Sequence, residues 1–92
     1  MFHYVTLGSN DVGRSAAFYD RVMAVLGAVR TVSTGTEVAY GLSPGNNLLY
    51  LVVPHLQYPA NWGNGTMVAF SAASRQQVRD FHAAAVAAGG KD

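Results

Sequence analysis

The chain has 92 residues, of which 50% are hydrophobic and 12% are charged, against about 25% charged residues in an average soluble protein. This length allows one structural domain, and this composition excludes a disordered chain. The net charge of +1 involves no basic run, and the longest apolar run, 48–53, is far shorter than the roughly 20 residues that span a bilayer. We therefore expect no nucleic-acid partner and no membrane association. The chain has no cysteine, which excludes disulfides and favours a cytoplasmic location.

The first pattern is that of a strand followed by a helix. Residues 2–9 are rich in aromatic and β-branched side chains and predict a strand. Asp11 is a typical helix N-cap, and apolar side chains recur from there to Leu26 at three- and four-residue spacing. We predict a helix over 12–26 that ends before Gly27 and covers a sheet. The side chains that we expect to pack on that sheet are Phe18, Tyr19, Val22 and Met23.

Three strand-like segments follow the predicted helix, at 28–33, 36–42 and 48–53, and turn-forming residues separate them. Together with the opening strand and helix they give the order β-α-β-β-β, which we define as a first module over residues 1–53. The next stretch, 54–65, holds two prolines, two glycines and two asparagines. Such a composition is typical of irregular structure, and we predict a linker there.

The opening pattern returns after this linker. Residues 66–72 predict a strand, Ser74 is a second N-cap, and 75–88 predict a second helix. When the chain is aligned with itself so that Ser74 meets Asp11, the caps and core positions of both halves agree without a gap. We infer that 66–92 is the start of a second module, and we expect its remaining strands to follow Asp92. The paired positions include Val5 with Val68, Phe18 with Phe81 and Gly27 with Gly90.

The segments HYVTLGSNDVGRSAAFYDRVMAVLGA at 3–28 and GNGTMVAFSAASRQQVRDFHAAAVAAGG at 63–90 resemble the glyoxalase, bleomycin-resistance and extradiol-dioxygenase superfamily. The first segment contains the pattern D-x-x-R-S-x-x-F-Y from Asp11 to Tyr19. The resemblance implies the vicinal oxygen chelate fold, an α+β architecture in which paired βαβββ modules surround a small-molecule site. It does not select a reaction, since this fold hosts lyases, dioxygenases, epimerases and drug-binding proteins.

The resemblance also implies where metal ligands would lie, on the first and the last strand of each module. It places Tyr4 and Met67 at the two first-strand positions, and 48–53 contains no His, Asp or Glu. Divalent metal ions prefer imidazole and carboxylate ligands, so we predict no metal and no other cofactor. His3 is next to Tyr4, but adjacent strand residues point to opposite faces, so it would become a ligand only through a bulge.

Five further side chains carry reactive or aromatic groups. His55, Tyr58 and Trp62 form an aromatic cluster in the linker that either borders a binding cleft or pins the linker to the sheet. Glu37 is a general base if it faces a dry cavity, and an ordinary exposed carboxylate otherwise. His82 shares the spacing of a helix surface. No serine lies in a nucleophile-elbow context, so the catalytic residues stay unassigned.

Strand alternation turns one set of side chains away from the helix, and this set would line a cavity. We predict that the chain binds a small, partly apolar molecule there without a metal. The alternative is a metal-dependent lyase or dioxygenase that uses ligands outside this segment. The low charge and an open sheet edge predict a homodimer. The predicted ligand-binding residues are Tyr4, Thr6, Tyr50, Trp62, Met67 and Ala69.

Overall fold

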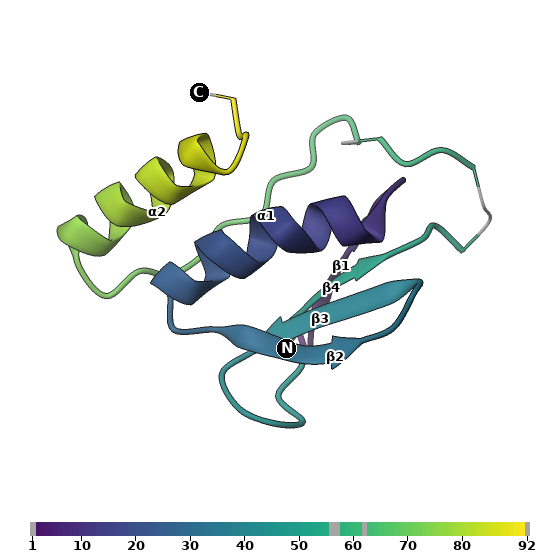
Figure 1. Ribbon diagram of the computed structural model, residues 1–92, viewed down its shortest axis with the longest axis horizontal. Coiled ribbons are helices and arrows are strands. Elements are labelled where there is room, and N and C mark those ends of the chain that lie inside the picture. The colour runs from purple at the N-terminus through teal and green to yellow at the C-terminus, as the bar shows by residue number, and fades with distance from the viewer. Residues whose placement is uncertain (1, 56–57, 62, 92) are drawn as a thin grey trace.

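The computed structural model describes residues 2–55, 58–61 and 63–91, and it has an α+β architecture (Figure 1). The sheet has the order β1-β4-β3-β2, in which β1 runs parallel to β4 and the other neighbours are antiparallel. This arrangement confirms the predicted βαβββ order of the first module. The elements are β1 (Val5–Gly8), α1 (Val12–Val25), β2 (Val29–Ser33), β3 (Glu37–Gly41), β4 (Leu49–Val52) and α2 (Arg75–Ala87).

Both helices begin at the predicted caps. The Asp11 carboxylate accepts a hydrogen bond from the Arg14 backbone N–H at 3.0 Å, and Ser74 caps α2 in the same way. Gly27 lies two residues after the end of α1, at φ +79°, a conformation that glycine adopts without strain. In α2 the corresponding glycine is Gly89, with φ +107°, rather than the predicted Gly90. The second helix is therefore one residue shorter relative to its cap than the internal repeat predicts.

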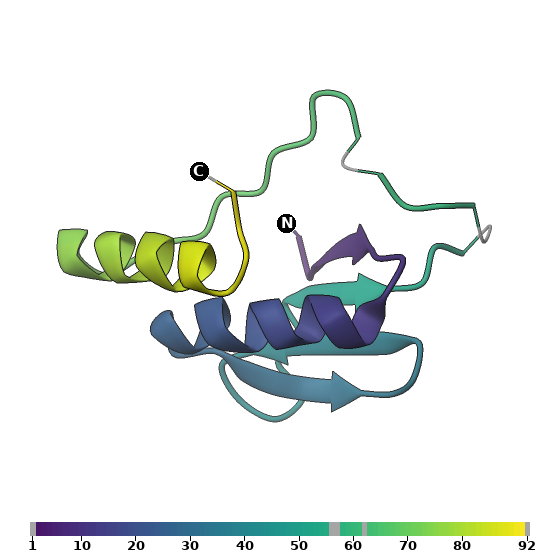
Figure 2. The same cartoon turned by 45° about the horizontal axis from the view of Figure 1, so that its top comes forward.

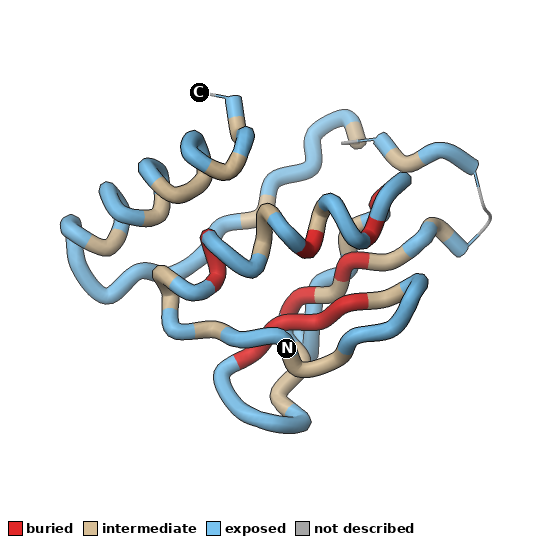
Figure 3. The backbone as a smooth tube through the Cα atoms, in the orientation of Figure 1, coloured by how far each residue is buried: buried red, intermediate tan, exposed pale blue. Residues whose placement is uncertain are grey.

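The helix α1 covers one face of the sheet, and the core lies between them (Figure 3). Val22 and Met23 are buried as predicted, while Phe18 and Tyr19 are partly buried at the edge of the core. The helix also contributes Val12 and Ala16, and the strand side chains of the core come from β3 and β4, because these are the two central strands. The fully buried side chains of this core are Tyr40, Leu51 and Val22.

The second helix packs along α1 rather than on the strands, and its Phe81, Ala84 and Ala85 lie against the edge of the core (Figures 1 and 2). The side chain of Gln77 donates to the backbone carbonyl of Val25 at 2.8 Å, which fixes the start of α2 against the end of α1. Neither of these helices is long and apolar enough to cross a membrane, within the residues that the structure describes.

The predicted strand over 66–72 is wrong, since this segment carries no strand in the described range 63–91. A strand needs hydrogen bonds from a neighbouring backbone, and no described strand pairs with this segment. Met67 is 89% exposed, whereas the Phe70 ring lies 5.8 Å from the Phe81 ring of α2, measured between ring centroids. Phe70 therefore packs this segment against a helix instead of a sheet.

Candidate functional site

The strand register divides the sheet into two faces, since residues directly opposite on neighbouring strands point to the same side. One face carries Val5, Leu51 and Tyr40 and is covered by α1. We call the other side the open face. Its positions, read from the register, are Thr6, Gly8, Val29, Val32, Glu37, Ala39, Gly41, Tyr50 and Val52.

Three of the predicted site residues gather on the open face. Thr6 on β1 is the register partner of Tyr50 on β4. The rings of Tyr4 and Tyr50 meet edge to face, with centroids 5.0 Å apart and an interplanar angle of 64°. Tyr4 is 57% exposed and Thr6 is exposed as well. The structure therefore brings two phenol hydroxyls and one aliphatic hydroxyl to the same exposed surface.

A residue that the sequence analysis did not single out supports this cluster. The Nδ2 atom of Asn47 donates a hydrogen bond to the Tyr50 hydroxyl oxygen at 3.1 Å. The Oδ1 atom of the same amide is buried and has no hydrogen-bond partner. In the sequence Asn47 belongs to a turn-like stretch, and only its spacing of three residues before Tyr50 could have indicated the contact.

The open face carries one charged side chain among the positions defined above. Glu37 starts β3, is half-buried, and lies opposite Val52 in the register. It therefore shares the face with Tyr50, which lies two residues before Val52 on the paired strand β4. A ligand on this surface would meet a carboxylate and no basic strand residue, which disfavours an anionic ligand.

One end of the open face is bordered by the chain that follows β4. A Cβ atom added to Gly8 would lie 3.3 Å from side-chain carbons of both Pro54 and Ala60, so this segment packs closely over the end of β1. Asn10 holds the segment in place: its Oδ1 accepts from the Ala60 N–H at 2.7 Å, and its Nδ2 donates to the Ala60 carbonyl at 3.3 Å. This placement agrees with a linker that borders the site.

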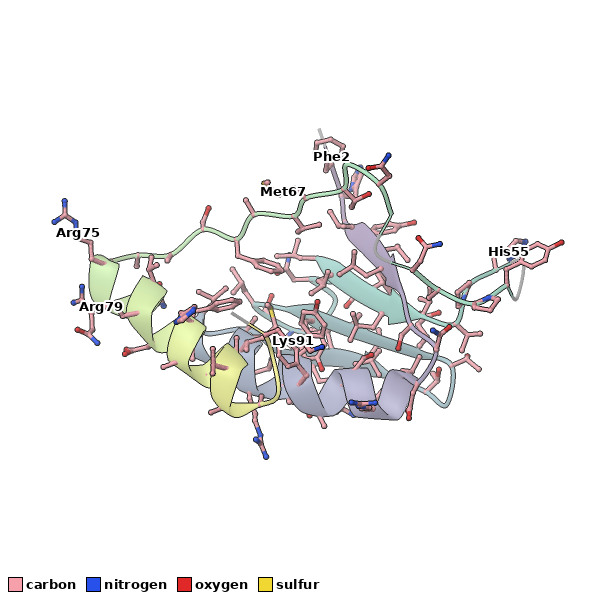
Figure 4. All side chains as sticks on the ribbon, turned by 90° about the horizontal axis from the view of Figure 1, so that it is seen from above. Phe2, His55, Met67, Arg75, Arg79 and Lys91 are labelled. Carbon is pink, nitrogen blue, oxygen red and sulfur yellow. The ribbon has the colours of Figure 1, made fainter. Side chains whose placement is uncertain are left out.

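The other predicted site residues are not brought to this cluster. Met67 is 89% exposed and points away from its segment (Figure 4). His55 lies on the segment that follows β4. Ala69 lines a hollow on the covered side. Trp62 lies outside the described residues. His3 and Tyr58 are exposed, and His82 is on the exposed side of α2.

The hollow on the covered side has a volume of about 370 Å³ and was not anticipated from the sequence. It lies between the end of α1, the sheet and residues 68–71, and its walls are mainly apolar. The open face and this hollow both offer apolar contact to a small molecule, as does a neighbouring hollow of about 430 Å³ that Leu7, Tyr19 and Phe70 help to line. The apolar side chains that line the hollow of about 370 Å³ include Val5, Met23, Leu26, Leu49, Val68 and Phe70.

The donor groups on the open face do not fit a divalent metal ion. The positions in question offer phenol and aliphatic hydroxyls and one carboxylate, whereas such ions prefer several imidazole or carboxylate ligands. Within residues 2–55, 58–61 and 63–91, no three His, Cys, Asp or Glu side chains lie close enough together to hold a metal. We therefore derive no chemical step through a metal.

The covered side contains the titratable groups that hold α1 on the sheet. Burial raises the pKa of Tyr19, and burial together with the hydrogen bond to Asp20 raises the pKa of Tyr40 far above its usual value. Both phenols therefore stay protonated at neutral pH. On the side opposite to the open face, the Tyr40 hydroxyl is a hydrogen-bond donor, and the Tyr19 ring packs against Phe18 and Tyr40.

No protein-family model matches the chain, and no curated protein matches it either. Among solved structures, the chain is similar to the crystal structure of a glyoxalase/bleomycin resistance protein from Albidiferax ferrireducens T118, with 34% sequence identity and a TM-score of 0.86. The match covers 97% of this chain and 70% of that protein. Both the fold and a substantial part of the sequence are thus shared.

Proposed function

The chain belongs to the glyoxalase/bleomycin-resistance superfamily, and from this we propose that it binds a small, partly apolar molecule on the open face of its sheet. The contact between Tyr4 and Tyr50 is the observation that carries the proposal. Two rings in edge-to-face contact provide apolar area, and their hydroxyls and that of Thr6 provide polar groups that orient a ligand.

The proposed role is binding without a chemical step by this chain. Tyr4 and Tyr50 would contact the apolar part of the ligand, and Thr6 would donate or accept a hydrogen bond beside them. The proposed site does not include Ala69, which lines the hollow on the covered side. The alternative within the same superfamily, a metal-dependent lyase or dioxygenase, needs ligands that the open face does not provide.

The experiment is a fragment screen by protein-observed NMR on the wild type and on two matched variants. Thr6→Glu places a carboxylate on the open face, and Val68→Glu places one at the hollow on the covered side. We expect the hits to be lost in Thr6→Glu and kept in Val68→Glu. If the hits were lost in Val68→Glu and kept in Thr6→Glu, the binding site would lie on the covered side, which would contradict the proposal.

A second arm addresses turnover. The hits are incubated with the protein in the presence and absence of added Zn²⁺, Ni²⁺ or Mn²⁺, and the products are followed by NMR. We expect binding without conversion in every sample. Conversion that depends on added metal would favour the lyase or dioxygenase alternative. Met67→Glu in the same series reports whether the site extends to residues 66–72.

A further inference from the structure

We propose that the Tyr50 hydroxyl is the hydrogen-bond donor that selects ligands with a neutral oxygen acceptor, and that Asn47 is the positioning residue that directs its proton. This inference rests on the proposed function, because it concerns the same surface. It adds the chemical class of the ligand, a neutral carbonyl, ester or ether compound with an apolar body.

The direction of the hydrogen bond between the two side chains carries the argument. A phenol has a single proton and can also accept a hydrogen bond at its oxygen. Because the Nδ2 atom of Asn47 donates to the Tyr50 oxygen at 3.1 Å, that oxygen acts as the acceptor in this pair. The proton of Tyr50 is therefore not used by Asn47 and is available to another acceptor.

The Asn47 amide is held beside Tyr50 by this contact. Its Oδ1 atom is buried and has no hydrogen-bond partner. The bond from Nδ2 to the Tyr50 oxygen is therefore the side-chain hydrogen bond that positions this amide.

The surroundings of Tyr50 decide the charge of the ligand. The Tyr4 ring contacts the Tyr50 ring edge to face and restricts its position. Glu37 lies on the same face, and the strand positions of this face include no Lys or Arg. A carboxylate or phosphate on the ligand would be repelled by Glu37 without a basic group to compensate. A neutral oxygen acceptor is accommodated without this cost.

The test uses two probes of the same size and shape. Acetophenone carries a carbonyl oxygen where cumene carries a methyl group, so their difference in affinity measures the hydrogen bond. Binding is followed by NMR titration of the wild type, Tyr50→Phe, Asn47→Asp and the control Asn64→Asp. Tyr50→Phe removes the hydroxyl and keeps the ring. Asn47→Asp replaces the amide donor by a carboxylate acceptor. The Tyr50 proton would then turn toward this carboxylate and away from the ligand.

We expect acetophenone to bind the wild type more tightly than cumene and to lose about fivefold in affinity in both Tyr50→Phe and Asn47→Asp. Cumene should bind all proteins equally, and the exposed control Asn64→Asp should match the wild type. A purely structural role of Asn47 would weaken both probes together, and that result would overturn the inference. Unchanged acetophenone affinity in Tyr50→Phe would overturn it as well.

The failure of this inference is distinguishable from the failure of the proposed function. If both probes shift the resonances of Tyr4 and Tyr50 but do not differ in affinity, the binding surface stands and the role of Tyr50 is refuted. If neither probe shifts these resonances, the binding surface itself is refuted. Urea denaturation of each variant establishes that it is folded, and Tyr50→Phe decides the question if Asn47→Asp does not fold.

Discussion

The Tyr40 hydroxyl lies 2.7 Å from Asp20 Oδ1 and donates to it, which joins the central strand β3 to α1. The Ala16 carbonyl is a second acceptor at 3.1 Å. On its other side Asp20 pairs with Arg30 of β2, with the shorter nitrogen–oxygen distance at 2.6 Å. One carboxylate therefore connects the helix to two strands on the covered face. Tyr40 is 1% exposed, so its hydroxyl has no route to water as a substitute partner.

Tyr40→Phe should destabilise the protein by about 1–2 kcal/mol, because the Asp20 carboxylate and the Ala16 carbonyl lose their hydroxyl donor while the ring is kept. Urea denaturation monitored by circular dichroism measures this change. Tyr58→Phe is the matched control, since Tyr58 is 74% exposed and should leave stability unchanged. Equal stabilities of the two variants would mean that the hydrogen bond contributes nothing.

The acid dependence of stability should report on Asp20. Partial burial raises the pKa of this carboxyl, but the hydrogen bonds from Arg30 and Tyr40 and the charge of Arg30 outweigh it and lower the pKa. A carboxyl with a lowered folded-state pKa stabilises the fold above its unfolded-state pKa, and this contribution is lost as the pH falls through the folded-state value.

Asp20→Asn should therefore be less stable than the wild type at pH 7. We expect a difference below about 1 kcal/mol, because the Asp20 side chain is 45% exposed. The difference should shrink as the pH falls below about 4. Urea denaturation of both proteins across this range checks the sign. A gap that widens on acidification would contradict the assignment.

Leu51→Ala should destabilise the protein by about 2–5 kcal/mol, since it removes a side chain that is 1% exposed from the centre of β4 and leaves a cavity beneath α1. Leu42→Ala removes the same atoms from a position that is 64% exposed and should change stability by less than about 0.5 kcal/mol. Thermal and urea denaturation of the pair give the comparison. If both variants lost similar amounts of unfolding free energy, Leu51 would not be a core residue.

Asn10→Ala should release the segment that borders the open face, because both hydrogen bonds to Ala60 are lost. We expect faster hydrogen exchange of the Ala60 amide, because its N–H loses the Asn10 Oδ1 acceptor, with little change in the global unfolding free energy. Asn64→Ala serves as the control for an exposed asparagine in the same segment. An unchanged exchange rate of the Ala60 amide in Asn10→Ala would show that other contacts hold this segment.

The protein should form a homodimer, with the partner covering apolar surface around the open face. The strand β1 is at one end of the described sheet, and Phe2 and Met67 are 96% and 89% exposed. An edge strand flanked by exposed apolar side chains favours association with another chain. Light scattering at tens of micromolar protein measures the mass. A monomer under these conditions would refute the prediction.

Helix boundaries were predictable from the sequence because their causes are local. The hydroxyl or carboxylate of a cap reaches an N–H three residues away, so Asp11 and Ser74 could be assigned from their immediate neighbours. The three strands after α1 also lie within the predicted ranges, since turn residues separate them. The strand predicted over 66–72 failed because its hydrogen-bond partner would have to come from elsewhere in the fold.

The candidate site was partly predictable for the same reason. Period-two alternation placed Tyr4 and Thr6 on the side away from the helix. That Tyr50 meets Tyr4 in ring contact depends on the parallel pairing of β1 with β4, which brings together residues far apart in sequence. The sequence by itself therefore determined which side chains share a strand face and where each helix starts. Only the tertiary structure decided which of those faces α1 covers, and which hydroxyls and amides meet, because these contacts form between separate elements when the sheet assembles.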